Sequence, residues 1–173
     1  MSVLWKWPGS RWWKCDFHIH TSESPCYRDP NGYTPSAWLA EAEKKGIQVL
    51  AVTDHNTANA IQSIQQENVS RGGSLVVFPG VELTVLDGIH VLALFDPGKS
   101  AGDICAFMGR CKIPTEKWGK PDCIAPVHLL EAVQNIRASG AVCMLAHVTG
   151  PGGVLTKATP GVGRGPVKIA FPP

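Results

Sequence analysis

Short runs of apolar residues alternate along the chain with longer segments in which apolar residues recur every three or four positions. In residues 15–19, Phe17 and Ile19 fall on one face and polar side chains on the other, which is typical of a strand. Further strand-like runs cover residues 47–53, 75–78, 81–86, 89–95 and 141–146. Helical spacing covers residues 35–45, 59–69 and 129–136. This alternation predicts an α/β fold, either layered or a barrel.

Local signals mark where these elements begin and end. Thr34 suits an N-cap and Pro35 the first helical position of residues 35–45, and Gly46 ends that helix. Pro79-Gly80 predicts an interruption between two strands, and Asp87-Gly88 predicts a hairpin turn. About four or five strands are visible, whereas a closed parallel barrel needs roughly eight. The sequence therefore predicts only part of a barrel.

Composition supports one folded domain of 173 residues, with 44% hydrophobic and 17% charged residues. The formal charge of +2 provides no basic arm for nucleic acid. Neither a signal peptide nor a membrane-spanning stretch is expected. The six cysteines are scattered, which predicts free thiols and a cytoplasmic location. Cys105, Cys111 and Cys123 have spacings that match no common zinc motif, so a loop with free thiols is expected there.

The chain divides into three predicted segments. Residues 1–13 are rich in tryptophan, residues 14–155 form the folded domain, and residues 156–173 form a tail rich in glycine and proline. The composition that disfavours helices and strands begins at Gly150, because the last 24 residues hold 6 glycines and 5 prolines. We expect loop rather than helix or strand from Gly150 onward.

Candidate metal ligands lie at or beside the ends of the predicted strands. Because strand ends of α/β folds face the functional site, side chains from distant segments can meet there. Imidazoles and carboxylates bind zinc, manganese and iron, and a carboxylate can bridge two ions. Taken singly, each residue also fits a structural role, as a surface, turn or core histidine or as a solvated edge carboxylate. The candidates are His18, His20, His55, Glu82, His90 and His147.

The position of His90 depends on the hairpin. With a strict two-residue turn at Asp87-Gly88, Glu82 faces Ala93, and His90 points to the opposite face of the sheet. A three-residue loop or a bulge, which a glycine permits, would bring His90 and Glu82 to the same face. Shared metal ligation therefore requires the three-residue loop or the bulge.

Several of these segments resemble the motifs of the PHP (polymerase and histidinol phosphatase) family. Residues 16–21 (DFHIHT) resemble its first motif, residues 52–56 (VTDHN) its second, and residues 146–147 its third. Residues 79–84 (PGVELT) and 88–92 (GIHVL) resemble the family's glutamate and its next histidine. The resemblance covers about residues 9–155 and is strongest to the PHP module that begins TrlF-type ATPases.

The resemblance implies a distorted (βα)7 barrel, related to the TIM barrel, that binds up to three divalent ions and hydrolyses phosphate esters. A metal-bound water would be the nucleophile, so no protein side chain is assigned that role. Zinc, manganese and iron are the candidate metals. Carried over by motif, the ligands are His18, His20 and Glu82 for the first ion, Glu82, His90 and His147 for the second, and His55 for the third.

The chain also departs from the family pattern. The family's aspartate or histidine five or six positions after His20 is replaced by Pro25 and Cys26. Either a Cys26 thiolate takes its place, which would favour zinc, or the site lacks this ligand. Asp16 and Asp54 are expected to orient imidazoles. The fourth motif, Asp-x-His, is missing, because no aspartate or histidine follows His147. The resemblance therefore implies a truncated module.

Two functions follow from these expectations. The first is a metal-dependent phosphoesterase with a phosphate-ester substrate. The alternative is an inactive or structural metal-binding module that docks to an ATPase domain of a longer chain or to a nucleic-acid-processing partner. Four of the six tryptophans lie in residues 1–13, which permits such a docking surface but fits a core role better. No phosphate-binding Gly-x4-Gly-Lys-Ser/Thr loop occurs, so ATP hydrolysis by this chain has no support.

Overall fold

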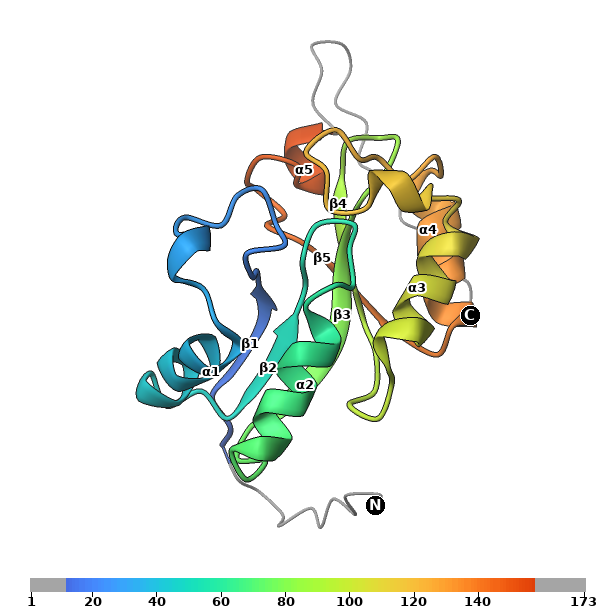
Figure 1. Cartoon of the computed structure of the whole chain (residues 1–173). Coiled ribbons are helices and arrows are strands. Elements are labelled where there is room, and N and C mark those ends of the chain that lie inside the picture. The colour runs from blue at the N-terminus through green and yellow to red at the C-terminus, as the bar shows by residue number, and fades with distance from the viewer. Residues whose placement is uncertain (1–11, 158–173) are drawn as a thin grey trace.

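The computed structural model describes residues 12–157, which form a mixed five-stranded sheet (Figure 1). The strand order follows the chain, with β1 next to β2 and β5 at the far edge. β1, β2 and β3 are parallel, and β4 is antiparallel to both β3 and β5. The strands are β1 (Cys15–Ile19), β2 (Val49–Val52), β3 (Val76–Thr84), β4 (His90–Leu94) and β5 (Val142–Leu145).

Helices cover one face of this sheet (Figure 1). In the main core, α1 packs against α2 and α3 against α4. The opposite face carries a smaller apolar cluster around Leu92 and Leu94, with Phe17 and Phe78 packed edge to face at its border. The helices are α1 (Pro35–Lys44), α2 (Ile61–Ser70), α3 (Ala101–Arg110), α4 (Leu129–Ala138) and α5 (Val154–Lys157), with short 3-10 turns η1 (Pro30–Gly32) and η2 (Thr115–Lys117).

The residues predicted to begin and end α1 are confirmed. The Thr34 hydroxyl accepts a hydrogen bond from the amide of Ala37 at 3.1 Å, and Pro35 is the first helical residue. Gly46 follows the helix with a φ of +69°, a backbone conformation that glycine adopts without strain.

The expectation of a loop around the three cysteines was wrong at Cys105, because α3 includes this residue. The missed signal is a capping box, in which Ser100 and Asp103 each hydrogen-bond the other's backbone amide. Cys111 and Cys123 lie outside α3, and all three thiols are free, as predicted. These three cysteines form no metal-binding cluster in residues 12–157.

The predicted break at Pro79-Gly80 was also wrong, because β3 runs through both residues. The pair instead marks a change of partner: residues 76–79 pair with β2, and residues 80–84 pair with β4. A Cβ atom at Gly80 would lie only 2.8 Å from the carbonyl oxygen of Ala93. Glycine therefore allows the close backbone approach that the second pairing requires.

The described residues form a mixed α/β fold whose sheet curls like half of a barrel. Loop was expected from Gly150 onward, but Val154–Lys157 form one helical turn. Most of the tryptophan-rich segment and most of the glycine- and proline-rich tail lie outside the described residues. Among residues 12–157, no helix has both the length and the hydropathy needed to cross a membrane.

Candidate metal centre

The carboxylate of Glu82 lies at the centre of five imidazoles. Glu82 is on β3, and its side chain has no exposed surface. Each oxygen contacts a different set of ring nitrogens. Oε2 lies 2.9 Å from Nε2 of His18, 3.1 Å from Nε2 of His20 and 3.4 Å from Nδ1 of His55. Oε1 lies 2.8 Å from Nδ1 of His90 and 3.1 Å from Nε2 of His147.

The sheet topology explains this convergence. His20 and His55 follow the parallel strands β1 and β2, so both lie at the edge of the sheet where these strands end. His147 follows β5, which has the same direction. β4 has the opposite direction, so its first residue, His90, lies at this same edge. Backbone pairing continues past β2 and places His55 opposite Glu82.

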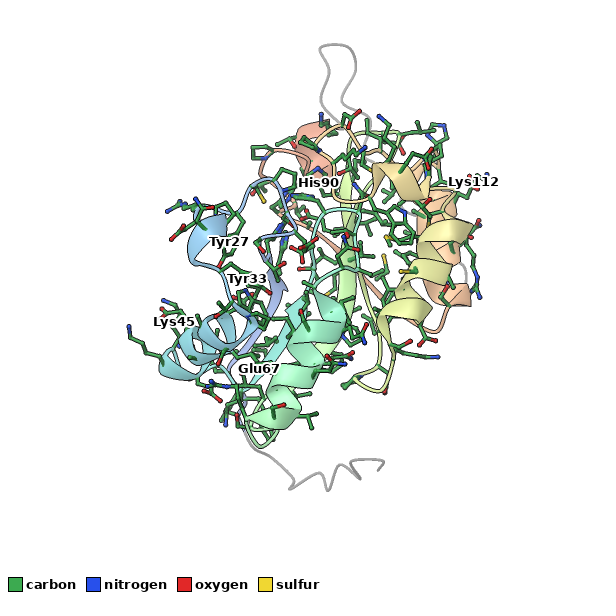
Figure 2. The ribbon with its side chains drawn as sticks, in the orientation of Figure 1. Tyr27, Tyr33, Lys45, Glu67, His90 and Lys112 are labelled. Carbon is green, nitrogen blue, oxygen red and sulfur yellow. The ribbon has the colours of Figure 1, made fainter. Side chains whose placement is uncertain are left out.

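The hairpin has the longer loop that shared ligation requires. Val85 pairs with Ile89 through an amide-to-carbonyl hydrogen bond of 3.0 Å, which leaves residues 86–88 as a three-residue loop. Gly88 has a φ of +67°, as the left-handed position of such a loop demands. Glu82 therefore faces Leu92, and this register places His90 on the same face of the sheet as Glu82. Figure 2 labels His90 at this end of β4.

A glycine turn after β5 closes over His90. The amide of His90 donates to the carbonyl oxygen of Gly152 at 2.7 Å. A Cβ atom at Gly152 would lie 2.9 Å from two atoms of the His90 ring, and the φ of +76° also favours glycine. His147, which precedes this turn, has a φ of +25°, uncommon for a residue other than glycine. Backbone strain thus accompanies a site residue.

The electrostatics of the cluster favour charged Glu82 and neutral His55. Burial alone would raise the pKa of Glu82, but hydrogen bonds with three of the surrounding imidazoles outweigh it and hold this pKa far below its usual range. The hydrogen bond to Glu82 raises the pKa of His18. Burial lowers the pKa of His55 to about 4. An ionised carboxylate and a neutral imidazole are the forms that bind metal ions.

The donor set fits divalent metal ions. Three groups of side chains have ligand atoms within 4.8 Å of one another. Glu82 belongs to two of them. Nitrogen and carboxylate oxygen donors suit zinc, manganese and iron. The groups are His18, Glu82 and His147; His55, Glu82 and His90; and His20, Cys26 and His55.

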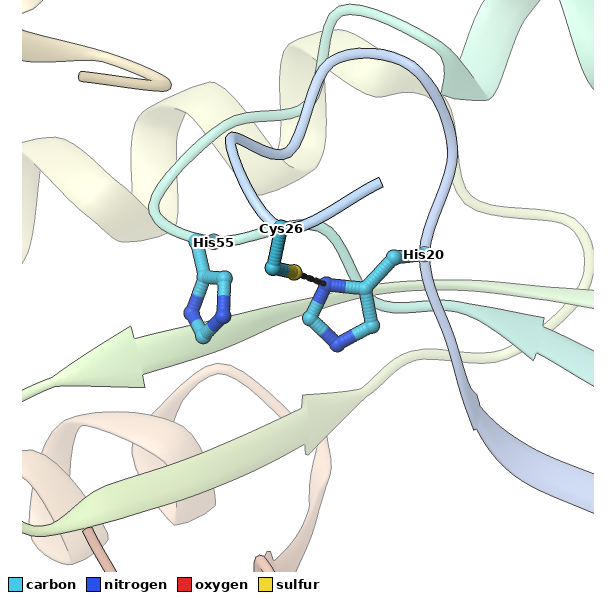
Figure 3. A group of neighbouring side chains, drawn as sticks. All are labelled: His20, Cys26 and His55. Carbon is cyan, nitrogen blue, oxygen red and sulfur yellow. Dashed lines mark hydrogen bonds between the residues drawn. The ribbon is translucent and has the colours of Figure 1, made fainter. Parts of the chain in front are cut away.

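Cys26 reaches the cluster from the loop after β1. Figure 3 shows its side chain between those of His20 and His55. The Cys26 sulfur lies 3.3 Å from Nδ1 of His20. The carbonyl oxygen of His20 accepts a hydrogen bond from the Trp38 indole on α1, at 3.0 Å, which fixes this end of the loop. The third group therefore adds a soft sulfur donor to two imidazoles.

The two aspartates expected to orient imidazoles have other hydrogen-bond partners within residues 12–157. Asp16 accepts from the backbone amide of His18 at 3.2 Å. Asp54 is buried and accepts from the amide and hydroxyl of Thr21 and from the hydroxyl of Ser24. The Ser24 hydroxyl in turn accepts from the His55 amide at 3.0 Å. Asp54 thus fixes the loop backbone on which Cys26 lies, and sequence reasoning missed the part that Ser24 plays.

Comparisons with known proteins give partial matches. No family model matches the chain. It is 33% identical over 82 residues to the 5'-3' exoribonuclease Rnm of Escherichia coli, and this match covers 46% of the chain but only 26% of that enzyme. It is 35% identical over 79 residues to the PolC-type DNA polymerase III of Staphylococcus epidermidis, covering 45% of the chain and 5% of the polymerase.

A similar fold occurs in a solved structure. A protein of Bifidobacterium adolescentis, assigned as a metal-dependent phosphoesterase, superimposes with a TM-score of 0.54 over 80% of this chain and 68% of its own. The two share 18% sequence identity, so this likeness concerns the fold. The order of the motifs, the two partial relatives and this fold all agree with the resemblance to the PHP family.

Proposed function

We propose that the chain is a metal-dependent phosphoesterase that hydrolyses phosphoric esters. The observation that carries the proposal is the division of contacts at Glu82. One carboxylate oxygen contacts His18, His20 and His55, and the other contacts His90 and His147. A buried carboxylate between two sets of imidazoles suits the bridging ligand of a two-ion site. We assign the third ion to His55, with Cys26 as its sulfur ligand.

The residues of the chain have defined tasks in this proposal. Divalent ions bound here would act as Lewis acids on the ester and would lower the pKa of a bound water. The histidines and Glu82 hold these ions in a fixed arrangement, and Asp54 fixes the loop that holds Cys26. Zinc, manganese and iron are the metals we propose. We also propose a cytoplasmic location, since the six cysteines are free thiols.

The substrate is proposed from the relatives. One is an exoribonuclease and the other a DNA polymerase, so esters of nucleic acids are the first to test. The polymerase relative also favours the second candidate, a metal-binding module without turnover inside a longer chain or beside an ATPase domain, because the match covers 5% of that polymerase.

Metal content and hydrolysis test the proposal together. We expect at least two ions per purified chain by elemental mass spectrometry, and hydrolysis of bis(p-nitrophenyl) phosphate or a 5'-phosphorylated oligoribonucleotide with manganese or zinc. His20→Ala or His147→Ala should abolish hydrolysis while the circular dichroism spectrum is kept. His128→Ala is the matched control, since His128 pairs with Asp87 outside the cluster.

The outcomes separate the two candidates. Bound metal without turnover of any ester would favour the structural module. Folded protein that binds no added zinc or manganese would overturn both.

Replacing Cys26 should change the metal preference. A Cys26→Ser variant removes the soft donor, so we expect zinc affinity to fall at least about tenfold relative to manganese. Competition between the two metals at equilibrium measures the ratio of zinc affinity to manganese affinity. Cys15→Ser is the control, because Cys15 is also exposed but its sulfur lies near the carbonyl oxygen of Trp13. If the two variants have the same zinc-to-manganese affinity ratio, Cys26 is not a metal ligand.

A further inference from the structure

Asn56 directly follows His55 on the loop after β2, and only 1% of its surface is exposed. Its φ of +48° lies in the left-handed region, which residues other than glycine adopt infrequently and asparagine adopts more readily than most. Such a backbone conformation persists where the surrounding contacts hold it in place. The hydrogen bonds of Asn56 therefore indicate what this residue does.

All four polar groups of Asn56 have hydrogen-bond partners. Its backbone amide donates to the carbonyl oxygen of Glu82 at 2.9 Å, and its carbonyl oxygen accepts from the amide of Gly119 at 3.2 Å. The side-chain oxygen Oδ1 accepts from the amide of Thr84 at 3.2 Å. The side-chain nitrogen Nδ2 donates to the carbonyl oxygen of Cys123 at 3.0 Å. Asn56 thus joins the loop after β2 to the end of β3 and to the segment between η2 and α4.

The contacts with β3 lie beside the central carboxylate of the metal cluster. One is the carbonyl group of Glu82 itself, and the other is the amide of Thr84, two residues later. His55 pairs with Glu82 across the two backbones, and Nδ1 of His55 lies 3.4 Å from the Glu82 carboxylate. Asn56 therefore fixes the separation of two chain segments that each carry a candidate metal ligand.

We propose that Asn56 is a positioning residue of the metal centre. Its side chain holds the backbones of His55 and Glu82 at the separation that metal ligation by both residues needs. The proposal rests on the proposed metal-dependent function and adds a residue that controls the geometry of the same site. Asn56 is not a metal ligand in this account, because both polar atoms of its side chain are hydrogen-bonded to backbone groups.

Replacing Asn56 with glycine tests the side chain, because glycine keeps the left-handed backbone and loses both side-chain hydrogen bonds. We expect zinc affinity to fall at least about tenfold, since losing a group that orients metal ligands typically costs about 10–100-fold. Competition with a chromophoric chelator measures the zinc affinity. Asn56→Asp should restore part of it, because it keeps an oxygen that accepts from the amide of Thr84.

Bound cobalt separates a positioning role from a merely structural one. At saturating cobalt(II), the visible absorption spectrum reports the geometry of the ligands, and a loss of stability alone leaves it unchanged. We expect the spectrum to change in Asn56→Gly and to return toward that of the wild type in Asn56→Asp. Asn68→Ala is the matched control, because Nδ2 of Asn68 also donates to a backbone carbonyl oxygen, that of Leu75, before the start of β3. This control should keep the wild-type spectrum and zinc affinity.

A measurement on the wild type keeps the test open if Asn56→Gly does not fold. Coupling between sites is reciprocal, so bound zinc should strengthen the hydrogen bonds that Asn56 makes. We expect zinc to slow hydrogen exchange of the Thr84 and Gly119 amides at least about tenfold more than that of the Gly46 amide. Gly46 is the internal control, because its amide donates to the carbonyl oxygen of Glu43 at the end of α1.

The outcomes distinguish this inference from the proposed function. Unchanged zinc affinity and cobalt spectrum in Asn56→Gly, or equal slowing at all three amides in the wild type, would overturn the role of Asn56 and leave the metal centre in place. If the wild type binds zinc but hydrolyses no ester, the phosphoesterase proposal fails, and these measurements still test Asn56 because none of them uses turnover. A wild type that binds no metal would overturn the metal centre and the role of Asn56 together.

Discussion

Replacing Glu82 with glutamine is expected to remove metal and activity together. The amide keeps the shape of the side chain, but it loses the charge and offers one acceptor oxygen where the carboxylate offers two. The ions held by the two sets of imidazoles then lack their shared anionic ligand. We expect hydrolysis to fall at least about 1000-fold, equivalent to about 4 kcal/mol of transition-state stabilisation, and bound metal to fall below one ion per chain.

Elemental mass spectrometry and the hydrolysis rate of bis(p-nitrophenyl) phosphate measure the two effects on the same preparation. Glu131→Gln is the control, because this carboxylate lies on the surface and pairs with Lys112. Two retained ions and turnover within about tenfold of the wild type would show that Glu82 is not the bridging ligand.

Replacing Asp54 with alanine is expected to destabilise the chain strongly. Its carboxylate accepts hydrogen bonds of 2.7 Å from the amide and hydroxyl of Thr21, and of 2.6 Å from the hydroxyl of Ser24. Asp54 is 1% exposed, and Thr21 and Ser24 are also buried, so water cannot readily replace these contacts. Leaving such donors unpaired costs about 1–3 kcal/mol each. We expect the free energy of unfolding to fall by about 3–5 kcal/mol.

Urea denaturation followed by circular dichroism measures this change. Asp54→Asn should be less severe, because it keeps one acceptor oxygen. Asp122→Ala is the control for the loss of a surface carboxylate, since Asp122 is exposed and pairs with Lys117. A loss in Asp54→Ala no larger than in Asp122→Ala would mean that the loop does not depend on this carboxylate.

The sequence by itself determined the features that depend on neighbouring residues. Alternation predicted the strand that precedes His20, and Thr34-Pro35 predicted the start of α1, because strand periodicity and helix capping are local. The motif order named the candidate ligands, and strand ends predicted that they meet. The hairpin was predicted, but its loop length was open, because Asp87-Gly88 permits more than one register.

The tertiary structure decided the features that depend on long-range pairing. Only the register between β3 and β4 places His90 beside Glu82, and only the folded sheet divides the histidines between its two carboxylate oxygens. The hydrogen bonds of Asp54 also depend on the fold, because a buried carboxylate binds the donors that lie near it, and here these belong to a loop 30 or more residues earlier. The pocket lined by His20, Cys26 and Arg28 likewise forms only once that loop has folded.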